Sequence, residues 1–378
     1  MDISEVRPGN RRDVRQFIKL PFDIYKDIPQ WVPPLLPGEY KRFKPDYPFY
    51  NHSEAAFFLA RDNAGKPAGR IAVLEHRPHN EYRHAKDALL YLYEARDDDE
   101  VARLLFGAAE DWARARGLDR LVGPKGFLTV GEGLGLLIEG FEHRPTFGIP
   151  YNPAYYIRQW EQIGGMVKEV DYLSVFFQFE DYIFPPKLHE LAERVKQRRG
   201  FTIQSFKSKE ALLSYVPAIQ KAYNEAFVDV WSYTPIPDKD MQELVDKLLV
   251  VTKPEMLKLI FKDDEVIGFV FAYLDISAGL QKIKGRLWPL GWLALLLEKR
   301  RTKWASVTAT AVLPQYQGLG ANIVMYDELL RTLIETSQFD CVEVMQMQED
   351  NMKILGDLEK MMIQTLYKRY RIYQRNLG

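Results

Sequence analysis

The chain has 378 residues, 47% of them hydrophobic and 27% charged, a composition typical of a globular protein with about two to three domains. Its formal net charge of −1 gives no electrostatic reason to expect nucleic acid as a partner. The single cysteine, Cys341, excludes an internal disulfide, argues against a cysteine-built metal site and fits a reducing, cytoplasmic location. We expect no metal cofactor.

The first half of the chain contains a series of elements that recurs later. A helix-rich segment is followed by a hairpin, a strand, an amphipathic helix and another strand. The amphipathic helix has apolar residues at the 3.6-residue period, and Gly117 marks its end. The elements are expected at residues 11–27, 57–60 paired with 69–75, 89–95, 101–115 and from Leu121 onward.

The second half predicts the same order, which indicates a divergent internal duplication. Its elements are expected at residues 211–228, 256–261 paired with 266–274, 304–313, 319–336 and 341–347. The boundary is expected within residues 181–187, where Pro185 and Pro186 stiffen the chain. We therefore expect one domain over residues 1–180 and a second over residues 187–378.

The loop at residues 315–321, QYQGLGA, leads from the strand at 304–313 into the helix that follows. Gly318 and Gly320 allow tight turns and a close approach of the backbone to a ligand. The helix start offers unpaired N–H groups with a partial positive charge, so the combination predicts a phosphate-binding site. The loop fits neither G-x-x-x-x-G-K-[ST] nor the three-glycine dinucleotide pattern. The alternative is an ordinary turn in which the glycines serve only geometry.

The spacing of Gln315, Gly318 and Gly320 resembles Q-x-x-G-x-G/A, the pyrophosphate loop of the GNAT acyltransferase superfamily, and the repeated order of elements is similar to the GNAT order. The resemblance implies an α/β (α+β) fold of two tandem GNAT-like domains, each with a mixed, mostly antiparallel sheet flanked by helices. This arrangement is shared with N-myristoyltransferase and the FemABX peptidyltransferases. It also implies an enzyme that transfers an acyl group from acetyl-CoA or a longer acyl-CoA to an amine. Main-chain groups of Gln317, Gly318, Leu319, Gly320 and Ala321 would bind the diphosphate, and those of Ala311, Val312 and Leu313 would pair with the pantetheine arm.

The corresponding place in the first half has an acidic run, Arg96-Asp97-Asp98-Asp99-Glu100, in place of the glycines. Aspartates cap a helix N-terminus well, but several carboxylates there would repel a diphosphate. We therefore expect one CoA per chain, in the second domain, and a degenerate first domain.

Amine acylation by a thioester needs a base, a group that polarises the carbonyl, and an acid that returns a proton to the thiolate. The resemblance indicates Glu343, on the strand at 341–347, as the base. It also indicates a tyrosine acid seven residues after Asn351, where this chain has Leu358. Tyr367 and Tyr370 lie further along, as candidate acids or as aromatics that pack a strand edge.

Two segments are candidates for the amine-acceptor site. One is the Gly/Pro/aromatic run at residues 123–156, with Asn152 and Tyr155, whose alternative role is packing between the domains. The other lies in the first helices of the second half, with Asn224, Trp231 and Tyr233, a region that covers the acceptor side in GNAT folds.

An apolar run at residues 287–297, LWPLGWLALLL, has basic residues on both sides. It is too short to span a bilayer, and its composition suits a peripheral contact of residues 286–303 with the inner membrane face. The alternative is a helix that covers the core. The run would suit a long acyl chain or a lipid amine, and the chain faintly resembles the GNAT-like bacterial acyltransferases that N-acylate sphingoid bases.

Two other functions stay open. A CoA-binding sensor or scaffold without catalysis is favoured by Leu358 at the position of the acid. A FemABX-like aminoacyltransferase would use a charged tRNA, which the net charge of −1 does not favour.

Overall fold

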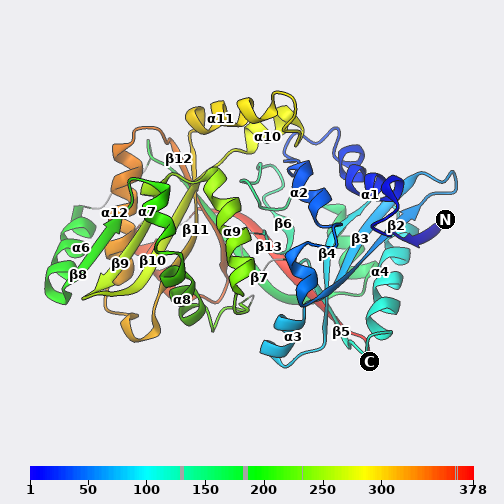
Figure 1. Ribbon diagram of the computed structural model, residues 1–378, viewed down its shortest axis with the longest axis horizontal. Helices are drawn as coiled ribbons and strands as arrows, with labels where there is room; N and C mark the ends of the chain where they lie inside the picture. The colour runs from blue at the N-terminus through cyan, green and yellow to red at the C-terminus, as the bar shows by residue number, and fades with distance from the viewer. Residues whose placement is uncertain (128–131, 182–185, 232, 362, 364) are drawn as a thin grey trace. The chain divides into compact units, whose positions relative to one another are not determined.

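The computed structural model describes residues 1–127, 132–181, 186–231, 233–361, 363 and 365–378. The chain forms two compact units (Figure 1). Unit 1 consists of Met1–Tyr172, Ser277–Leu295 and Lys368–Gly378, and unit 2 of Leu173–Ile276 and Leu296–Tyr367. Residues 182–185, at the expected boundary, lie outside the described residues. Unit 1 also takes two segments from the C-terminal half of the chain.

Unit 1 is built on a mixed sheet with the strand order β1-β2-β3-β4-β5-β13, in which β6 also pairs with β13. The pairing of β4 with β5 is parallel, and the pairs β1–β2, β2–β3, β3–β4, β5–β13 and β6–β13 are antiparallel. The strands are β1 (Asp2–Glu5), β2 (Glu54–Arg61), β3 (Pro67–Glu75), β4 (Asp87–Ala95), β5 (Arg120–Gly123), β6 (Leu136–Glu139) and β13 (Leu366–Asn376).

Helices cover both faces of this sheet. Gly69 and Arg70, neighbours on β3, point to opposite faces. A Cβ on Gly69 would meet Val101 and Leu105 of α4, whereas the Arg70 side chain donates to the Phe17 carbonyl of α1 at 2.9 Å. The helices are α1 (Arg11–Ile24), α2 (Leu36–Lys41), α3 (Arg77–Arg83), α4 (Asp99–Arg114), α5 (Tyr155–Arg158) and α10 (Ser277–Ile283), with shorter turns η1 (Pro48–Asn51) and η2 (Gln159–Ile163). Because it is covered on both sides, β3 is buried along nearly its whole length.

Unit 2 repeats this plan with the strand order β7-β12-β11-β10-β9-β8. Here β11 and β12 are the parallel pair, and β8–β9, β9–β10 and β10–β11 are antiparallel. The strands are β7 (Val167–Gln178, of which residues 173–178 belong to this unit), β8 (Phe201–Ser205), β9 (Leu257–Lys262), β10 (Glu265–Leu274), β11 (Trp304–Val312) and β12 (Cys341–Gln348). The helices are α6 (Pro186–Arg199), α7 (Lys209–Leu213), α8 (Val216–Ala226), α9 (Asp238–Val251), α12 (Ala321–Glu335) and α13 (Met352–Lys360), with turns η3 (Pro254–Met256) and η4 (Pro314–Tyr316).

Both units thus contain a hairpin, a strand, a helix and a parallel strand in the same order: β2-β3-β4-α4-β5 and β9-β10-β11-α12-β12. This confirms the expected fold, two similar domains with mixed, mostly antiparallel sheets. Helix α11 (Gly291–Arg301) follows α10 in the segment inserted between β10 and β11. No helix in the described part of the chain is long and apolar enough to cross a membrane.

Candidate functional site

β11 and β12 separate part-way along unit 2. Their parallel pairing ends at Val307↔Val344, whereas β11 continues to Val312 in its pairing with β10. At the point of separation Thr308 is an extra residue of β11, because Val307 and Ala309 oppose adjacent residues of β10. Such a bulge leaves the extra residue outside the hydrogen-bond ladder. The edge of β11 beyond Val307 therefore faces the opening between the two strands.

The loop that follows β11 has the geometry of an anion site. Gly318 and Gly320 have φ values of 74° and 88°, in the left-handed region that favours glycine. Gly320 is the N-cap of α12, and no side chain caps this helix. Within the described chain, the N–H groups of Gly318, Gly320 and the first three residues of α12, Ala321 to Ile323, have no hydrogen-bond acceptor, and the Val324 N–H is the first to pair, with the Gly320 carbonyl. A helix start with unpaired donors attracts anionic groups.

Cationic side chains lie beside this loop. Lys353 of α13 donates to Gln317 Oε1 at 2.6 Å. Helix α6 packs on α12, and its Val195 lies 3.0 Å from the position of a Cβ on Gly320. Arg198 and Arg199 follow in the last turn of α6, are exposed, and form no ion pair with any residue that the structure describes. The loop is thus bordered by positive charge on two helices.

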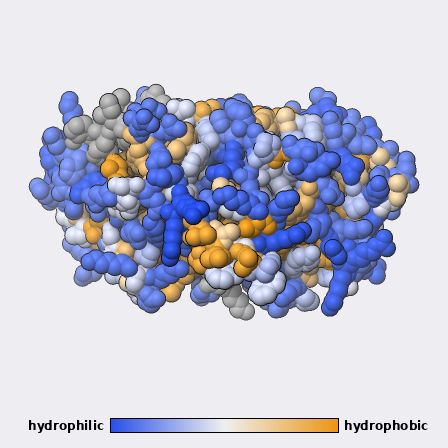
Figure 2. Space-filling model, turned by 90° about the horizontal axis from the view of Figure 1, so that it is seen from above, coloured by the Kyte–Doolittle hydropathy of each residue, from blue (hydrophilic) through white to orange (hydrophobic). Residues whose placement is uncertain are grey.

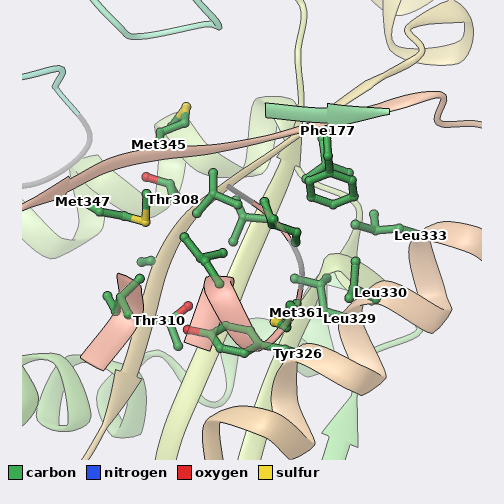
Figure 3. Close-up of a pocket in the computed structure, with 17 residues that line it drawn as sticks. Phe177, Thr308, Thr310, Tyr326, Leu329, Leu330, Leu333, Met345, Met347 and Met361 are labelled. Carbon is green, nitrogen blue, oxygen red and sulfur yellow. The ribbon is translucent and has the colours of Figure 1, made fainter. Parts of the chain in front are cut away.

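The opening between β11 and β12 leads into an apolar pocket (Figure 3). Its empty space, open mouth included, is ≈ 600 Å³. Its polar side chains are Thr308, Thr310 and Tyr326, of which Thr310 hydrogen-bonds to the Tyr326 hydroxyl. The rest of the wall is formed by Phe177, Val307, Ala309, Leu329, Leu330, Leu333, Val342, Val344, Met345, Met347, Ile354, Leu358, Met361 and Ile363.

The predicted pantetheine-binding residues are partly engaged within the chain. Ala311, Val312 and Leu313 are buried, as a strand end under a loop would be. The Leu313 N–H donates to the Ile267 carbonyl at 2.8 Å, and Gln317 Nε2 donates to the Val312 carbonyl at 3.0 Å. Gln315 is exposed on η4 and has no such contact with a described residue. The main-chain groups left for a ligand therefore lie earlier on β11, around the bulge.

Solved structures similar to this one include a tandem GNAT protein from the clavulanic acid biosynthesis pathway, with a TM-score of 0.58. It covers 100% of this chain and 98% of its own at 11% identity. The chain has the tandem GNAT fold. A second structure, a GCN5-related N-acetyltransferase from Sphaerobacter thermophilus, has a TM-score of 0.51 and covers 100% of this chain and 95% of its own at 12% identity.

Two curated relatives are similar in sequence to this GNAT-fold chain over its whole length. Protein YghO of Escherichia coli is 28% identical over 374 residues, which is 97% of this chain and 94% of that protein. The bacterial ceramide synthase of Caulobacter vibrioides is 27% identical over 386 residues, which is 100% of this chain and 98% of that enzyme. No protein-family model matches the sequence.

The equivalent loop of unit 1 is closed by its own side chains. Asp98 is the N-cap of α4, and its Oδ1 accepts from the Glu100 N–H at 2.9 Å. Arg158 pairs with Asp97 at 2.5 Å and also with Asp99. The donors that α12 leaves unpaired are therefore capped in α4, as the acidic run predicts.

The structure places the predicted catalytic residues in different surroundings. Glu343 is fully buried on β12 between Val342 and Val344, which both line the pocket, so its side chain points to the other face of the sheet. Asn351 caps α13 by accepting from the Ile354 N–H at 3.2 Å, which explains this residue by helix geometry alone. Leu358, seven residues later, is a wall of the apolar pocket.

The two candidate tyrosine acids lie on β13, in different units. Tyr367 belongs to unit 2 and stacks on Phe176 with ring centroids 4.9 Å apart. Tyr370 belongs to unit 1, is fully buried and lies opposite Leu137 of β6. Neither lines the pocket.

The expected acceptor residues of unit 2 form one hydrogen-bonded group. The Tyr233 hydroxyl donates to the Asn224 carbonyl at 2.8 Å, and Asn224 Oδ1 accepts from the Ile236 N–H at 3.2 Å. The Trp231 N–H donates to Gln348 Oε1, at the end of β12, at 2.8 Å. These contacts fix the segment after α8 next to the end of β12.

The expected acceptor residues of unit 1, Asn152 and Tyr155, form hydrogen bonds with main-chain groups of other segments. Asn152 accepts from the Leu137 N–H at 2.7 Å and donates to the Leu137 carbonyl at 3.1 Å, as a neighbouring strand would. The Tyr155 hydroxyl donates to the Ala95 carbonyl at 2.8 Å. Within the run at residues 123–156, residues 128–131 lie outside the described part.

Glu94 is a buried carboxyl group of unit 1 that the sequence analysis did not identify. Tyr25 and Tyr156 donate their hydroxyls to Glu94 Oε2 at 2.5 and 2.9 Å. Burial raises the pKa of Glu94 to about 7, although Arg70 and the two hydrogen bonds favour the carboxylate. The sequence signal was a lone acidic residue near the end of the apolar strand at 89–95.

A second buried network joins α3, β4 and β5. Lys125 Nζ lies 3.1 Å from His79 Nδ1, and His79 Nε2 lies 3.1 Å from Asp87 Oδ2, which also accepts from Arg120. Burial lowers the pKa of Lys125 to about 7 and that of His79 to about 4. His79 is thus neutral near pH 7 and bridges the lysine and the aspartate.

Among the described residues, one group has the spacing to hold a metal ion: His189, Glu193 and Asp327, with ligand atoms within 4.8 Å of one another. His189 Nδ1 lies 3.0 Å from Asp327 Oδ2. The contact joins α6 to α12, and a hydrogen bond between two packed helices accounts for it.

Proposed function

We propose that the protein is an acyl-CoA-dependent N-acyltransferase, which binds one CoA thioester per chain in unit 2 and transfers the acyl group to an amine. The observation that carries the proposal is the uncapped start of α12. Its unpaired N–H groups lie behind two left-handed glycines, at the end of a strand that opens onto an apolar pocket. The tandem GNAT fold and the ceramide synthase relative support the same reaction class.

The phosphates and the pantetheine arm of a CoA molecule have matching features in unit 2. The N–H groups of Gly318, Gly320 and the first turn of α12 suit the diphosphate. Arg198 and Arg199 suit the further phosphate of the nucleotide, because guanidinium groups bind phosphate through paired hydrogen bonds. The edge of β11 around Thr308 suits the amides of the pantetheine arm, which need donors and acceptors at strand-like spacing.

The pocket favours a long acyl chain over an acetyl group. Its wall is apolar apart from three hydroxyl groups, and burial of a methylene group contributes about 0.8 kcal/mol. Leu358, at the position of the expected tyrosine acid, extends this apolar wall. A ceramide is an amide of a long-chain amine, so the relative's name fits the transfer of a long acyl group to a lipid amine.

The reaction forms a C–N bond and breaks the C–S bond of the thioester. The amine nitrogen attacks the carbonyl carbon and gives its proton to a base, and the thiolate leaves and takes up a proton to become the CoA thiol. The backbone N–H of Thr308, outside the ladder, is our candidate donor to the carbonyl oxygen as negative charge develops there. Glu343 is our candidate base, and because its side chain lies on the face of β12 opposite the pocket, the amine would have to approach the carbonyl carbon from that face.

A CoA-binding sensor is the second candidate function. The observation that favours it is that the pocket presents Leu358 where the resemblance expects an acid. An acyltransferase releases free CoA and forms an amide, whereas a sensor binds the thioester without either product. Incubation with palmitoyl-CoA and long-chain amines, followed by thiol titration and mass spectrometry, should give free CoA and the amide. Binding without either product, across the panel of amines, would favour the sensor.

The CoA site itself is tested by calorimetry with acetyl-CoA and palmitoyl-CoA. Gly318→Asp should abolish binding, because it places a carboxylate before the unpaired N–H groups. A Cβ at Gly318 meets nothing within 4 Å, so the steric cost of the variant is the strain of its left-handed backbone, φ 74°, which Asp and Asn adopt more readily than most residues. Gly65→Asp is the matched control, since Gly65 has φ 75° and equally open space in the β2–β3 hairpin of unit 1. Gly318→Asn, which has the same shape without the charge, should bind more tightly than Gly318→Asp.

Wild-type affinity in Gly318→Asp would show that the loop is only a turn. No heat with either thioester, at concentrations well above micromolar, would refute the proposal.

A further inference from the structure

The segment of residues 288–297 exposes six large apolar side chains. Their exposed fractions are 85% for Trp288, 67% for Leu290, 50% for Trp292, 42% for Leu293, 49% for Leu296 and 39% for Leu297. We name these six residues the α11 face. Figure 2 shows hydrophobic side chains gathered between hydrophilic ones on the side of the molecule that carries α11. Exposed apolar patches of this kind mark interaction sites.

The α11 face is one side of a helix that turns its apolar residues outward. Trp292, Leu293, Leu296 and Leu297 recur at the spacing of a single helix face, and only Leu295 among the helix's leucines is buried. The alternative that this run covers the core therefore holds only for Gly291 and Leu295, the buried residues of α11. Contact of an apolar helix face with water is unfavourable in free energy, so the exposed face indicates that a partner or a less polar phase covers it.

The start of this segment is held firmly in unit 1. The Leu36 N–H donates to the Gly285 carbonyl at 3.0 Å, and Gln281 Nε2 donates to the carbonyls of Pro29 and Trp31 at 2.7 and 2.9 Å. Gly285 has φ 67°, and a Cβ there would lie 2.0 Å from the Pro34 carbonyl oxygen. The backbone thus presents Trp288 and Leu290 from a fixed base.

Positive charge flanks the α11 face. Residues 277–303 contain seven Lys or Arg residues and one acidic residue, Glu298, in a chain whose net charge is −1. Arg286, Arg300 and Arg301 are exposed and form no ion pair with any described residue. Arg286 also lies near Lys19, whose pKa is lowered by burial and by Arg286 and Arg15. The flanks therefore carry uncompensated positive charge.

We propose that the α11 face docks on an anionic lipid bilayer, with Trp288, Trp292 and the leucines in the interfacial layer and the flanking basic residues on the headgroups. Tryptophan, leucine and a cationic border are the side chains that interfacial helices use. A second copy of the chain is the other candidate occupant, but it would bring the same positive charge to the contact. The bilayer supplies both the apolar phase and the opposite charge.

The test is co-sedimentation of the full chain with lipid vesicles. Vesicles of phosphatidylcholine alone are compared with vesicles of one part phosphatidylglycerol to two parts phosphatidylcholine, without CoA. We expect binding to the anionic vesicles, weakened by salt above about 0.1 M, with a blue shift of tryptophan emission. Leu293→Gln/Leu296→Gln should lower the partition coefficient at least about tenfold, because it removes two inserted side chains.

A matched control replaces two leucines of similar exposure on other helices. Leu191→Gln/Leu213→Gln removes side chains that are 39% and 40% exposed and should leave vesicle binding unchanged. Arg300→Gln/Arg301→Gln should weaken binding to anionic vesicles by about fivefold per residue and have little effect on neutral ones.

Three results would overturn the proposal: no binding to anionic vesicles, equal loss in the control variant, or a solution dimer that Leu293→Gln/Leu296→Gln converts to monomer. The last result would assign the face to a second copy. Because no thioester is present, these outcomes are independent of the acyltransferase proposal.

Discussion

Ala309→Leu is the sharpest test of the acyl pocket. Ala309 is half-buried on β11, next to the bulge, and lines the pocket with the smallest side chain in its wall. Leucine adds three carbon atoms there, which take the space of about three methylene groups of an acyl chain. At about 0.8 kcal/mol per methylene, palmitoyl-CoA should lose about 2.4 kcal/mol of binding free energy, or about sixtyfold in affinity. Acetyl-CoA has no further methylene groups to displace and should lose much less affinity than palmitoyl-CoA.

The assay is calorimetry of both thioesters with wild type, Ala309→Leu and Ala211→Leu. Ala211 is exposed on α7 and serves as the matched control. Overpacking can cost about 1–3 kcal/mol of folding stability, so thermal unfolding without ligand must show that Ala309→Leu is folded at the assay temperature. Unchanged palmitoyl-CoA affinity, or an equal loss for both thioesters, would refute the assignment of the pocket to the acyl chain.

Three further predictions concern named charges. The pKa of Glu94 in the folded protein is about 7, above its ordinary value of 4.5. Protonated Glu94 therefore contributes to the free energy of unfolding in full below pH 4.5, and this contribution is lost as the pH rises through 7. Urea unfolding at pH 5 and pH 8 should show that the unfolding free energy of wild type falls by about 2.5 kcal/mol relative to that of Glu94→Gln over this interval; an equal change in both proteins would contradict the raised pKa. Asp98→Ala should lower unfolding free energy by about 1 kcal/mol without changing CoA affinity, whereas gained CoA binding in unit 1 would mean that the cap alone blocks that site. Arg198→Gln/Arg199→Gln should weaken CoA by about tenfold but spare dephospho-CoA, and equal weakening of the two would place the arginines elsewhere.

The sequence was sufficient for features that depend on neighbours along the chain. The hairpins, α4 and α12 follow from local periodicity, and the loop at residues 315–321 follows from two glycines between a strand and a helix. The contrast between the capped α4 and the uncapped α12 was also visible, because a capping aspartate acts within three residues of itself. Asn351 follows the same local logic, as the cap of α13.

Features that combine distant segments could not be predicted. The pocket draws its wall from β7, β11, β12, α12, α13 and the residues after α13, and no spacing in the chain indicates that these meet. Glu94 reaches Tyr25 and Tyr156 across 69 and 62 residues, so the environment that raises its pKa is purely tertiary. The association of residues 277–295 with unit 1 likewise rests on contacts with residues 29–36.

The course of β13 has a consequence for the order in which the protein can be made. The sheet of unit 1 has its strands β1 to β6 within the first 139 residues, but β5 and β6 pair with β13, whose residues 368–376 come more than two hundred positions later. During synthesis on the ribosome, β5 and β6 therefore lack their pairing partner, β13, until nearly the whole of unit 2 has been synthesised. A nascent chain in this state exposes sheet edges that favour wrong partners. Unit 1 should accordingly depend on chaperones during translation, and a fragment of residues 1–172 should misfold unless the β13 segment is supplied in trans.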